Sequence, residues 1–190
     1  MSKKILILDN YDSFTYNLVQ QIKELSTLSY DVVRNDVITV EETDQYDAFI
    51  LSPGPGLPKD SGILLDLIKR QMERKPIFGV CLGMQAISEV MGGTLFNLKK
   101  PLHGVSTEIE LQPDLMFKDM PSKTNVGRYH SWAVKADSLP AELLITAYDK
   151  DEVPMAIRHK NHPVSAVQFH PESILTDNGA TIIQNFLKQV

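Results

Sequence analysis

The chain has 190 residues and a net charge of −5, and 43% of its residues are hydrophobic and 23% are charged. These proportions are typical of globular proteins and exclude a disordered, collagen-like or coiled-coil chain. The length favours one domain, covering residues 1–190, around one hydrophobic core. An acidic chain presents no basic surface to a phosphate backbone or an anionic membrane, so we expect neither nucleic acid nor a membrane as a partner.

The first apolar run is short, and the chain has a single cysteine. Residues 5–8 are apolar and are followed by Asp9 and Asn10, which excludes a signal-peptide core. No stretch approaches the ~20 apolar residues that span a bilayer. One cysteine, Cys81, excludes an internal disulfide and a cysteine-rich zinc site. We therefore expect a soluble, cytoplasmic protein in which Cys81 is either a buried hydrophobic residue or a reactive thiol.

Apolar runs of strand length alternate with helical patterns in the first half of the chain. The residue pattern predicts strands at 4–8, 30–34, 48–51 and 77–80, and helices at 14–25, 63–72 and 84–91. Asp12 or Ser13 is a candidate N-cap for the first helix, and Ser61 lies near the start of the second. This alternation predicts an α/β fold built on an open, mainly parallel, flavodoxin-like sheet with helices on both faces.

The second half has strand patterns that are separated by turn signals rather than by helices. They lie at 94–98, 107–111, 131–135, 143–148, 155–158 and 164–168. We expect these strands to form an antiparallel extension of the same sheet, followed by a closing helix at about 178–188. His159 and His162 lie in a polar turn, where we expect both side chains to be solvated.

One segment between a predicted strand and a predicted helix has the form of a nucleophile elbow. Gly79-Val-Cys81-Leu-Gly83 places small residues two positions before and two after the cysteine, as a sharp strand-to-helix turn requires. Such a turn holds the side chain above the carboxyl end of the sheet, where α/β folds bind ligands. It also puts the sulfur at a helix N-terminus, whose dipole favours the thiolate. A core cysteine at a strand end is the alternative, and the two glycines favour the nucleophile.

A thiol nucleophile requires a base and a group that orients the base. Of the five histidines, only His170 lies in Gln168-Phe-His-Pro-Glu-Ser173, at the end of the apolar strand pattern at 164–168. Residues i and i+2 at a strand end point the same way, so His170 and Glu172 can lie side by side. Taken alone, the segment could be a structural turn. Together with the elbow, it predicts His170 as the base and Glu172 as the orienting group.

Acyl transfer also requires backbone donors that stabilise an oxyanion. The elbow supplies one donor at the N–H of Leu82. Ser52-Pro-Gly54-Pro-Gly56 follows the neighbouring strand and could supply the second, because a glycine at position 54 lets the backbone approach a ligand closely. An ordinary Pro/Gly turn is the alternative. Tyr129-His130-Ser131-Trp132 either lines a pocket or forms an aromatic packing cluster.

Five segments along the chain, in this order, resemble the class I (triad) glutamine amidotransferase family. They are Asp9-Asn-Tyr-Asp-Ser-Phe-Thr-Tyr-Asn17, Ser52-Pro-Gly-Pro-Gly56, Gly79-Val-Cys-Leu-Gly-Met-Gln85, Tyr129-His-Ser131 and Gln168-Phe-His-Pro-Glu-Ser173. The resemblance covers nearly the whole chain and implies the family's α/β fold. The first segment and the chain length resemble the glutaminase subunits that serve anthranilate synthase. Those that serve aminodeoxychorismate synthase are nearly indistinguishable on these motifs.

The resemblance implies a reaction and a role for each residue. Cys81 attacks the side-chain amide of L-glutamine, His170 moves the proton and Glu172 steadies His170. The oxyanion hole and glutamine recognition fall to Gly54, Gly56, Leu82, Gln85, and the backbone of Ser131 and Trp132. Ammonia passes to a chorismate-using synthase large subunit, held as a hetero-oligomer partner, which makes anthranilate for tryptophan biosynthesis. No cofactor is expected on this chain, and a magnesium ion is expected on the partner synthase subunit.

Two positions depart from the family pattern, and other functions stay open beside the anthranilate assignment. Val105 stands where the family commonly has Lys, and Trp132 stands where it commonly has Leu. One alternative is the glutaminase subunit of aminodeoxychorismate synthase, in folate biosynthesis. Another is a free-standing γ-glutamyl thiol hydrolase, which acts without a partner. A non-catalytic binding subunit is a further alternative, which the intact Cys81, His170 and Glu172 disfavour.

Overall fold

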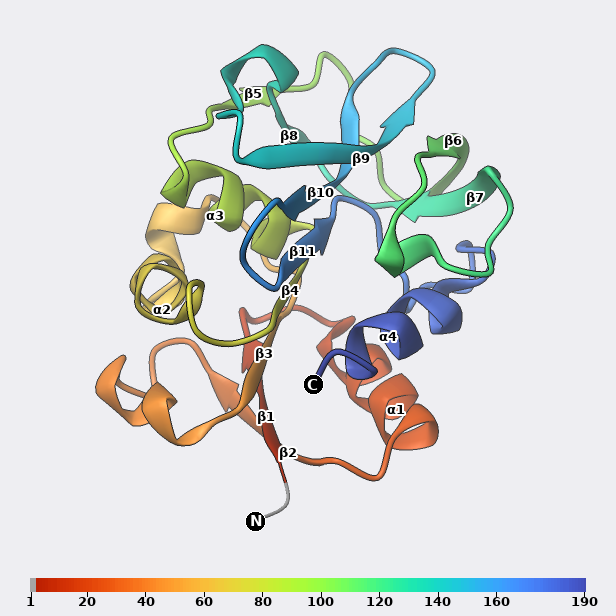
Figure 1. The fold of residues 1–190 in the computed structure, drawn as a ribbon. Helices are drawn as coiled ribbons and strands as arrows, with labels where there is room; N and C mark the ends of the chain where they lie inside the picture. Colours follow the sequence, from red (N-terminus) through yellow and green to blue (C-terminus); the bar gives the residue numbers. More distant parts are fainter. Residues whose placement is uncertain (1–2) are drawn as a thin grey trace.

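The computed structural model describes residues 3–190, which form a nine-stranded sheet flanked by four α-helices, and a separate two-stranded sheet (Figure 1). The strands are β1 (Lys4–Asp9), β2 (Ser29–Arg34), β3 (Ala48–Leu51), β4 (Ile77–Val80), β5 (Leu95–Asn97), β6 (Val105–Leu111), β7 (Lys123–Arg128), β8 (Trp132–Val134), β9 (Leu143–Asp149), β10 (Pro154–His159) and β11 (Val164–Val167). The helices are α1 (Thr15–Leu25), α2 (Leu64–Gln71), α3 (Leu82–Val90) and α4 (Gly179–Leu187).

The large sheet has a parallel half and an antiparallel half. Its strand order is β2-β1-β3-β4-β11-β10-β9-β6-β7. Neighbouring strands are parallel from β2 to β11 and antiparallel from β11 to β7. The order β2-β1-β3-β4 is that of flavodoxin-like sheets, in which ligands bind beyond the carboxyl ends of the strands. The expected α/β fold with an antiparallel extension is confirmed.

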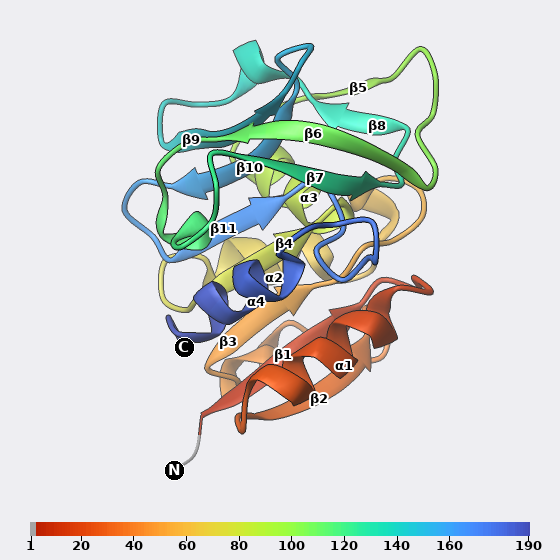
Figure 2. The ribbon, with the colours of Figure 1, turned by 90° about the vertical axis from the view of Figure 1, so that its right-hand side faces the viewer.

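Alternate residues of the central strands face two hydrophobic layers. On β1, Ile5 and Ile7 pack in the layer that includes α1 and α4, and Leu6 and Leu8 pack in the layer that includes α2 and α3. Figures 1 and 2 show these two helix pairs on opposite faces of the sheet. All four of these β1 side chains are fully buried, as a parallel strand covered on both faces requires.

β11 connects the end of the chain to the centre of the fold. It pairs in parallel with β4, with Val167 opposite Val80. The segment that follows β11 therefore leaves the sheet at the same edge as Cys81, which follows β4. This topology joins two motifs that lie far apart in the sequence.

The structure corrects the expected strands of the second half. β5 and β8 pair with each other, with Asn97 opposite Trp132, in a sheet of their own rather than extending the large one. The sequence pattern does not predict β7, because Lys-Thr-Asn-Val-Gly-Arg has one apolar residue and no alternation. β7 forms the edge of the large sheet by pairing with β6.

Two smaller expectations are also wrong. α1 has no side-chain N-cap, since the residue before it is Phe14 and the Asp12 carboxylate accepts from the Phe14 backbone N–H (2.8 Å) in the preceding turn. His159 is buried rather than solvated, and its Nδ1 accepts from the backbone N–H groups of Asn161 (3.1 Å) and His162 (2.9 Å). None of the helices within residues 3–190 has the length and apolar character that crossing a membrane requires.

Candidate active site

Cys81 occupies a strained turn between β4 and α3. Its backbone has φ +52° and ψ −98°, a region that residues other than glycine rarely adopt. A side chain at Gly79 would put its Cβ 2.7 Å from the backbone of Gly83, and one at Gly83 would put its Cβ 2.8 Å from the Leu51 carbonyl oxygen. Both flanking glycines are therefore required by close backbone approach, as the elbow interpretation predicts. The Cys81 backbone N–H donates to the Val167 carbonyl (2.8 Å), which fixes the turn to β11.

His170 and Glu172 lie side by side beyond the end of β11. His170 Nδ1 is 2.7 Å from Glu172 Oε1, and both side chains are buried. An ionised carboxylate only accepts hydrogen bonds, so Nδ1 carries the proton and Nε2 is the ring atom free to exchange a proton. The backbone of His170 is also held, because its N–H donates to Gly127 (3.0 Å) and its carbonyl accepts from the Thr176 hydroxyl (2.6 Å).

The surroundings of His170 favour its charged form. Burial lowers the pKa of His170, but the Cys81 sulfur and the Glu172 carboxylate together outweigh burial and raise this pKa to about 10. An imidazolium at neutral pH is the partner that a thiolate nucleophile requires. Phe14 and Tyr129 pack against the His170 ring with centroid distances of 5.1 and 4.9 Å, which restricts its rotation.

The loop after β3 lies directly against the start of α3. A Cβ on Gly54 would lie 2.5 Å from Leu82 Cδ2 and 2.7 Å from the Asn10 carbonyl oxygen, so only glycine fits there. Asn10 anchors this loop, because its backbone N–H donates to Ser52 Oγ (2.8 Å) and its side-chain Nδ2 donates to the Ser52 carbonyl (2.9 Å). Leu82 is the first residue of α3, so its N–H has no intrahelical acceptor. The two segments predicted to supply oxyanion donors are therefore adjacent.

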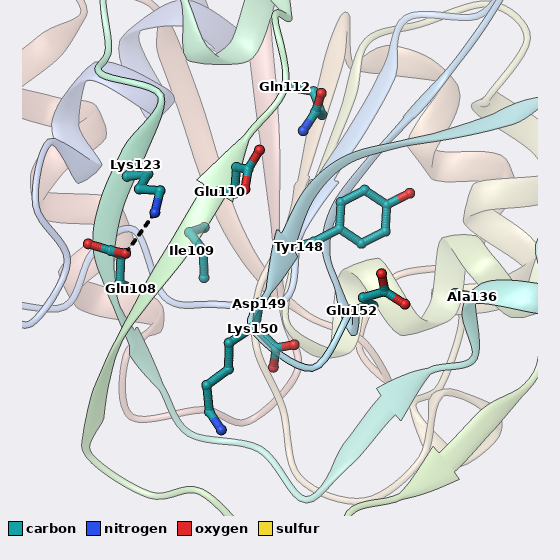
Figure 3. Close-up of a pocket in the computed structure, with 10 residues that line it drawn as sticks. All are labelled: Glu108, Ile109, Glu110, Gln112, Lys123, Ala136, Tyr148, Asp149, Lys150 and Glu152. Carbon is teal, nitrogen blue, oxygen red and sulfur yellow. Dashed lines mark hydrogen bonds and ion pairs between the residues drawn. The ribbon is translucent and has the colours of Figure 1, made fainter.

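A cavity of about 150 Å³ lies at this edge of the sheet. It is lined by Gly54, Pro55, Gly56, Cys81, Gln85, Tyr129, His130, Ser131 and Trp132. The structure thus gathers the predicted nucleophile and five predicted binding residues around one space. Tyr129 and His130 line it too, as the pocket interpretation of segment 129–132 predicts, and Pro55 is an addition. A larger hollow of about 630 Å³ on the antiparallel half, shown in Figure 3, contains none of them. Its lining includes Glu108, Lys123 and Tyr148.

Gln168 contacts the nucleophile and carries no role in the sequence prediction. Its Nε2–H donates to Cys81 Sγ (3.4 Å), and its Oε1 accepts from Gln85 Nε2 (3.3 Å). Gln85 Nε2 also donates to the Trp132 carbonyl (2.9 Å), which joins α3 to the first residue of β8. Gln168 lies at the end of a strand pattern, directly before the Phe-His-Pro-Glu segment. That position is the only signal in the sequence that could have indicated its contact with Cys81.

These residues define a class of site. A thiol on an elbow, an imidazole at the end of the neighbouring strand and a carboxylate beside the imidazole are the parts from which cysteine triads for acyl transfer are built. The family model described as "Glutamine amidotransferase class-I" matches residues 6–190. The chain belongs to this family.

Curated relatives cover almost the whole chain. "Aminodeoxychorismate/anthranilate synthase component 2" of Bacillus subtilis is 44% identical over 186 residues, which are 97% of this chain and 95% of that protein. "Anthranilate synthase component 2" of Pseudomonas aeruginosa is 42% identical over 193 residues, with coverage of 97% and 95%. "Bifunctional protein TrpGD" of Thermotoga maritima is 43% identical over 188 residues, and this chain spans only 32% of its length.

Solved structures share the fold. A protein from Thermoplasma acidophilum, described as a candidate GMP synthase subunit, superimposes with a TM-score of 0.88 at 27% identity, over 99% of this chain and 94% of that chain. A glutamine amidotransferase from Thermotoga maritima has a TM-score of 0.81 at 14% identity, and the match covers all of this chain and 98% of that chain. At that identity the second match supports the fold alone.

Proposed function

We propose that this chain is a glutaminase subunit that hydrolyses L-glutamine to glutamate and ammonia and delivers the ammonia to a chorismate-using synthase subunit that makes anthranilate. The observation that carries the proposal is the contact of Cys81, which lines a small polar cavity, with His170, whose other ring nitrogen pairs with Glu172, in a chain of the glutamine amidotransferase family. In this proposal residues 1–190 act as one unit in the cytoplasm.

The first half of the reaction forms a thioester. The Cys81 thiolate attacks the side-chain amide carbon of glutamine, and the carbonyl oxygen becomes an oxyanion held by the backbone N–H groups of Leu82 and Gly54. His170 then gives its Nε2 proton to the amide nitrogen. The carbon–nitrogen bond breaks, ammonia leaves, and a glutamyl thioester remains on Cys81. Glu172 keeps the His170 ring oriented while its charge changes.

The second half restores the enzyme. His170, whose Nε2 now carries no proton, removes a proton from water, and the water oxygen attacks the thioester carbon. The carbon–sulfur bond breaks, glutamate leaves and the Cys81 thiolate again faces the His170 imidazolium. The raised pKa of His170 supports this resting ion pair.

Gly56, Gln85, Ser131 and Trp132 bind the glutamine in this proposal, together with Gly54. The Gln85 Nε2 group is already engaged by the Trp132 carbonyl and Gln168, which leaves Gln85 Oε1 to accept from the substrate. The Ser131 carbonyl accepts from the Leu98 N–H (2.7 Å), so the main chain beside the cavity is fixed on both sides. The proposal gives this chain no cofactor and assigns the magnesium ion to the partner synthase subunit.

A second candidate is the glutaminase subunit of aminodeoxychorismate synthase. The Bacillus subtilis relative favours this second candidate, because the name of that protein includes both synthases. The test is to recover the partner from a native extract with this chain, to supply glutamine and chorismate, and to identify the product by mass. Anthranilate supports the proposal, aminodeoxychorismate supports the second candidate, and both products indicate a shared subunit. Hydrolysis of glutamyl compounds with no recovered partner overturns both and indicates a free-standing hydrolase.

A further inference from the structure

His130 is a buried imidazole at the cavity that takes no part in the triad. It is 6% exposed and lies between Arg128 and Trp132. Arg128 Nε–H donates to His130 Nε2 (3.1 Å), and an arginine cannot accept a hydrogen bond. Nε2 is therefore the acceptor and Nδ1 carries the proton. The Nδ1–H donates to the Trp132 carbonyl oxygen (2.8 Å).

The groups around His130 keep it neutral. Burial is the main cause that lowers its pKa to about 4, and the positive charges of Arg128 and His170 act in the same direction. The Trp132 carbonyl and Asp149 oppose them without reversing the shift. The ring therefore keeps one tautomer and one donor at neutral pH.

Arg128 is itself fixed to the antiparallel half of the sheet. Its Nη1 is 2.6 Å from Asp149 Oδ2, and both side chains are buried. The other oxygen of Asp149 accepts from the backbone N–H groups of Asp151 and Val153, both at 2.9 Å. A buried pair of this kind holds its geometry firmly, because breaking it leaves an uncompensated charge. The orientation of His130 is thus set by a rigid anchor on β9 and the turn after it.

The Trp132 carbonyl connects this anchor to the nucleophile. It accepts from His130 on one side and from Gln85 Nε2 (2.9 Å) on the other. Gln85 reaches Gln168, and Gln168 reaches Cys81 Sγ, as described above. Hydrogen bonds therefore run without a break from Asp149 to the sulfur. His130, Trp132, Gln85 and Cys81 all line the 150 Å³ cavity.

We propose that His130 is a positioning residue, whose Nδ1–H fixes the Trp132 carbonyl and thereby the main-chain wall and the Gln85 side chain that receive the substrate. The inference rests on the proposed function, since it takes glutamine as the occupant of the cavity. His130 does not touch the reacting atoms, so its loss weakens recognition of glutamine more than it weakens the chemistry at Cys81.

Two substitutions separate the two hydrogen bonds of His130. His130→Asn keeps an N–H donor at the position of Nδ1 but loses the acceptor for Arg128. His130→Gln keeps a polar side-chain amide near the position of Nε2 but loses the donor to the Trp132 carbonyl. In the complex with the synthase partner, His130→Gln raises KM for glutamine at least about tenfold, as expected for one lost hydrogen bond, with kcat changed less than about threefold. His130→Asn keeps KM within about threefold of the wild-type value.

His159→Gln is the matched control. His159 is also a buried imidazole, 3% exposed, but it does not line the cavity. This variant keeps the wild-type KM if the effect depends on position rather than on loss of a buried histidine. Equal KM values in the two His130 variants, or equal rises in His130→Gln and His159→Gln, overturn the positioning role.

Alkylation of Cys81 gives a second readout that does not need the partner. The probes are iodoacetamide and a glutamine analogue with a chloroketone in place of the amide. In His130→Gln the rate with the glutamine analogue falls about tenfold, and the rate with iodoacetamide stays within about threefold. Parallel loss with both probes contradicts the inference. If wild-type protein does not prefer the glutamine analogue, the proposed function itself fails, whatever the variants do.

Discussion

The protonation of His130 predicts a specific dependence of stability on pH. Its pKa is about 4 in the folded protein, against an ordinary value of 6.5, and burial is the main cause. Between these two pH values the unfolded chain binds a proton at this position and the folded chain does not. The free energy of unfolding therefore falls as pH decreases from 6.5 to 4. At about 1.4 kcal/mol per pH unit, this difference costs about 3 kcal/mol of stability at pH 4.

His130→Asn isolates this contribution, because asparagine does not titrate. The assay is urea unfolding of the full chain at steps between pH 7.5 and pH 4, for wild type and variant. The stability of the wild type relative to the variant falls by about 3 kcal/mol across that range. His170 acts with the opposite sign, since its raised pKa gives stability that is lost as pH rises from 6.5 towards 10, and it is present in both proteins. If the free energies of unfolding of wild type and His130→Asn differ by a constant amount down to pH 4, the buried neutral state of His130 is refuted.

Three further substitutions test the elbow, the orienting group and the loop anchor. Gly83→Ala places a Cβ 2.8 Å from the Leu51 carbonyl oxygen. We therefore expect the free energy of unfolding in urea to fall by about 1–3 kcal/mol and the glutaminase activity to fall at least about tenfold. Unchanged stability and activity contradict the tight elbow. Glu172→Gln removes the charge beside His170, so we expect kcat to fall about 10²- to 10⁴-fold. We also expect NMR to show a lower pKa for His170. An unchanged pKa of His170 refutes the pairing with Glu172. Asn10→Ala removes the side-chain hydrogen bond to the Ser52 carbonyl, so we expect kcat to fall several-fold and the free energy of unfolding in urea to fall by less than about 2 kcal/mol. The control is Asn17→Ala, on the exposed side of α1. An equal effect from this control contradicts a role for the anchor.

The parallel half of the fold follows from patterns that lie within short stretches of sequence. Buried runs such as residues 5–8 and 77–80 alternate with helical patterns along the chain, and the connection rules for β-α-β units then fix their arrangement. The antiparallel half depends on pairings that no single stretch specifies. β7 has little apolar character and is held by its partner β6 and by the Gly127 contact with His170.

The residues of the site also differ in how far the sequence alone could predict them. The residues around Cys81 and His170 lie in compact motifs whose spacing has a direct geometric meaning, so their positions could be predicted. The Arg128–Asp149 pair joins two residues 21 positions apart, and the sheet brings them together only through β6, which lies between β7 and β9. Gln168 has the pattern of a strand residue, and only the pairing of β11 with β4 places it on the Cys81 sulfur.

The most direct test of the central claim is the nitrogen source used by the complex that contains Cys81→Ala. The variant is assembled with the synthase partner, and product formation is measured with glutamine and, separately, with ammonium ion. The account predicts that glutamine-dependent synthesis falls at least about 10³-fold while ammonium-dependent synthesis stays at the wild-type rate, because only the thioester step needs the thiol. Glutamine-dependent synthesis at the wild-type rate contradicts the account.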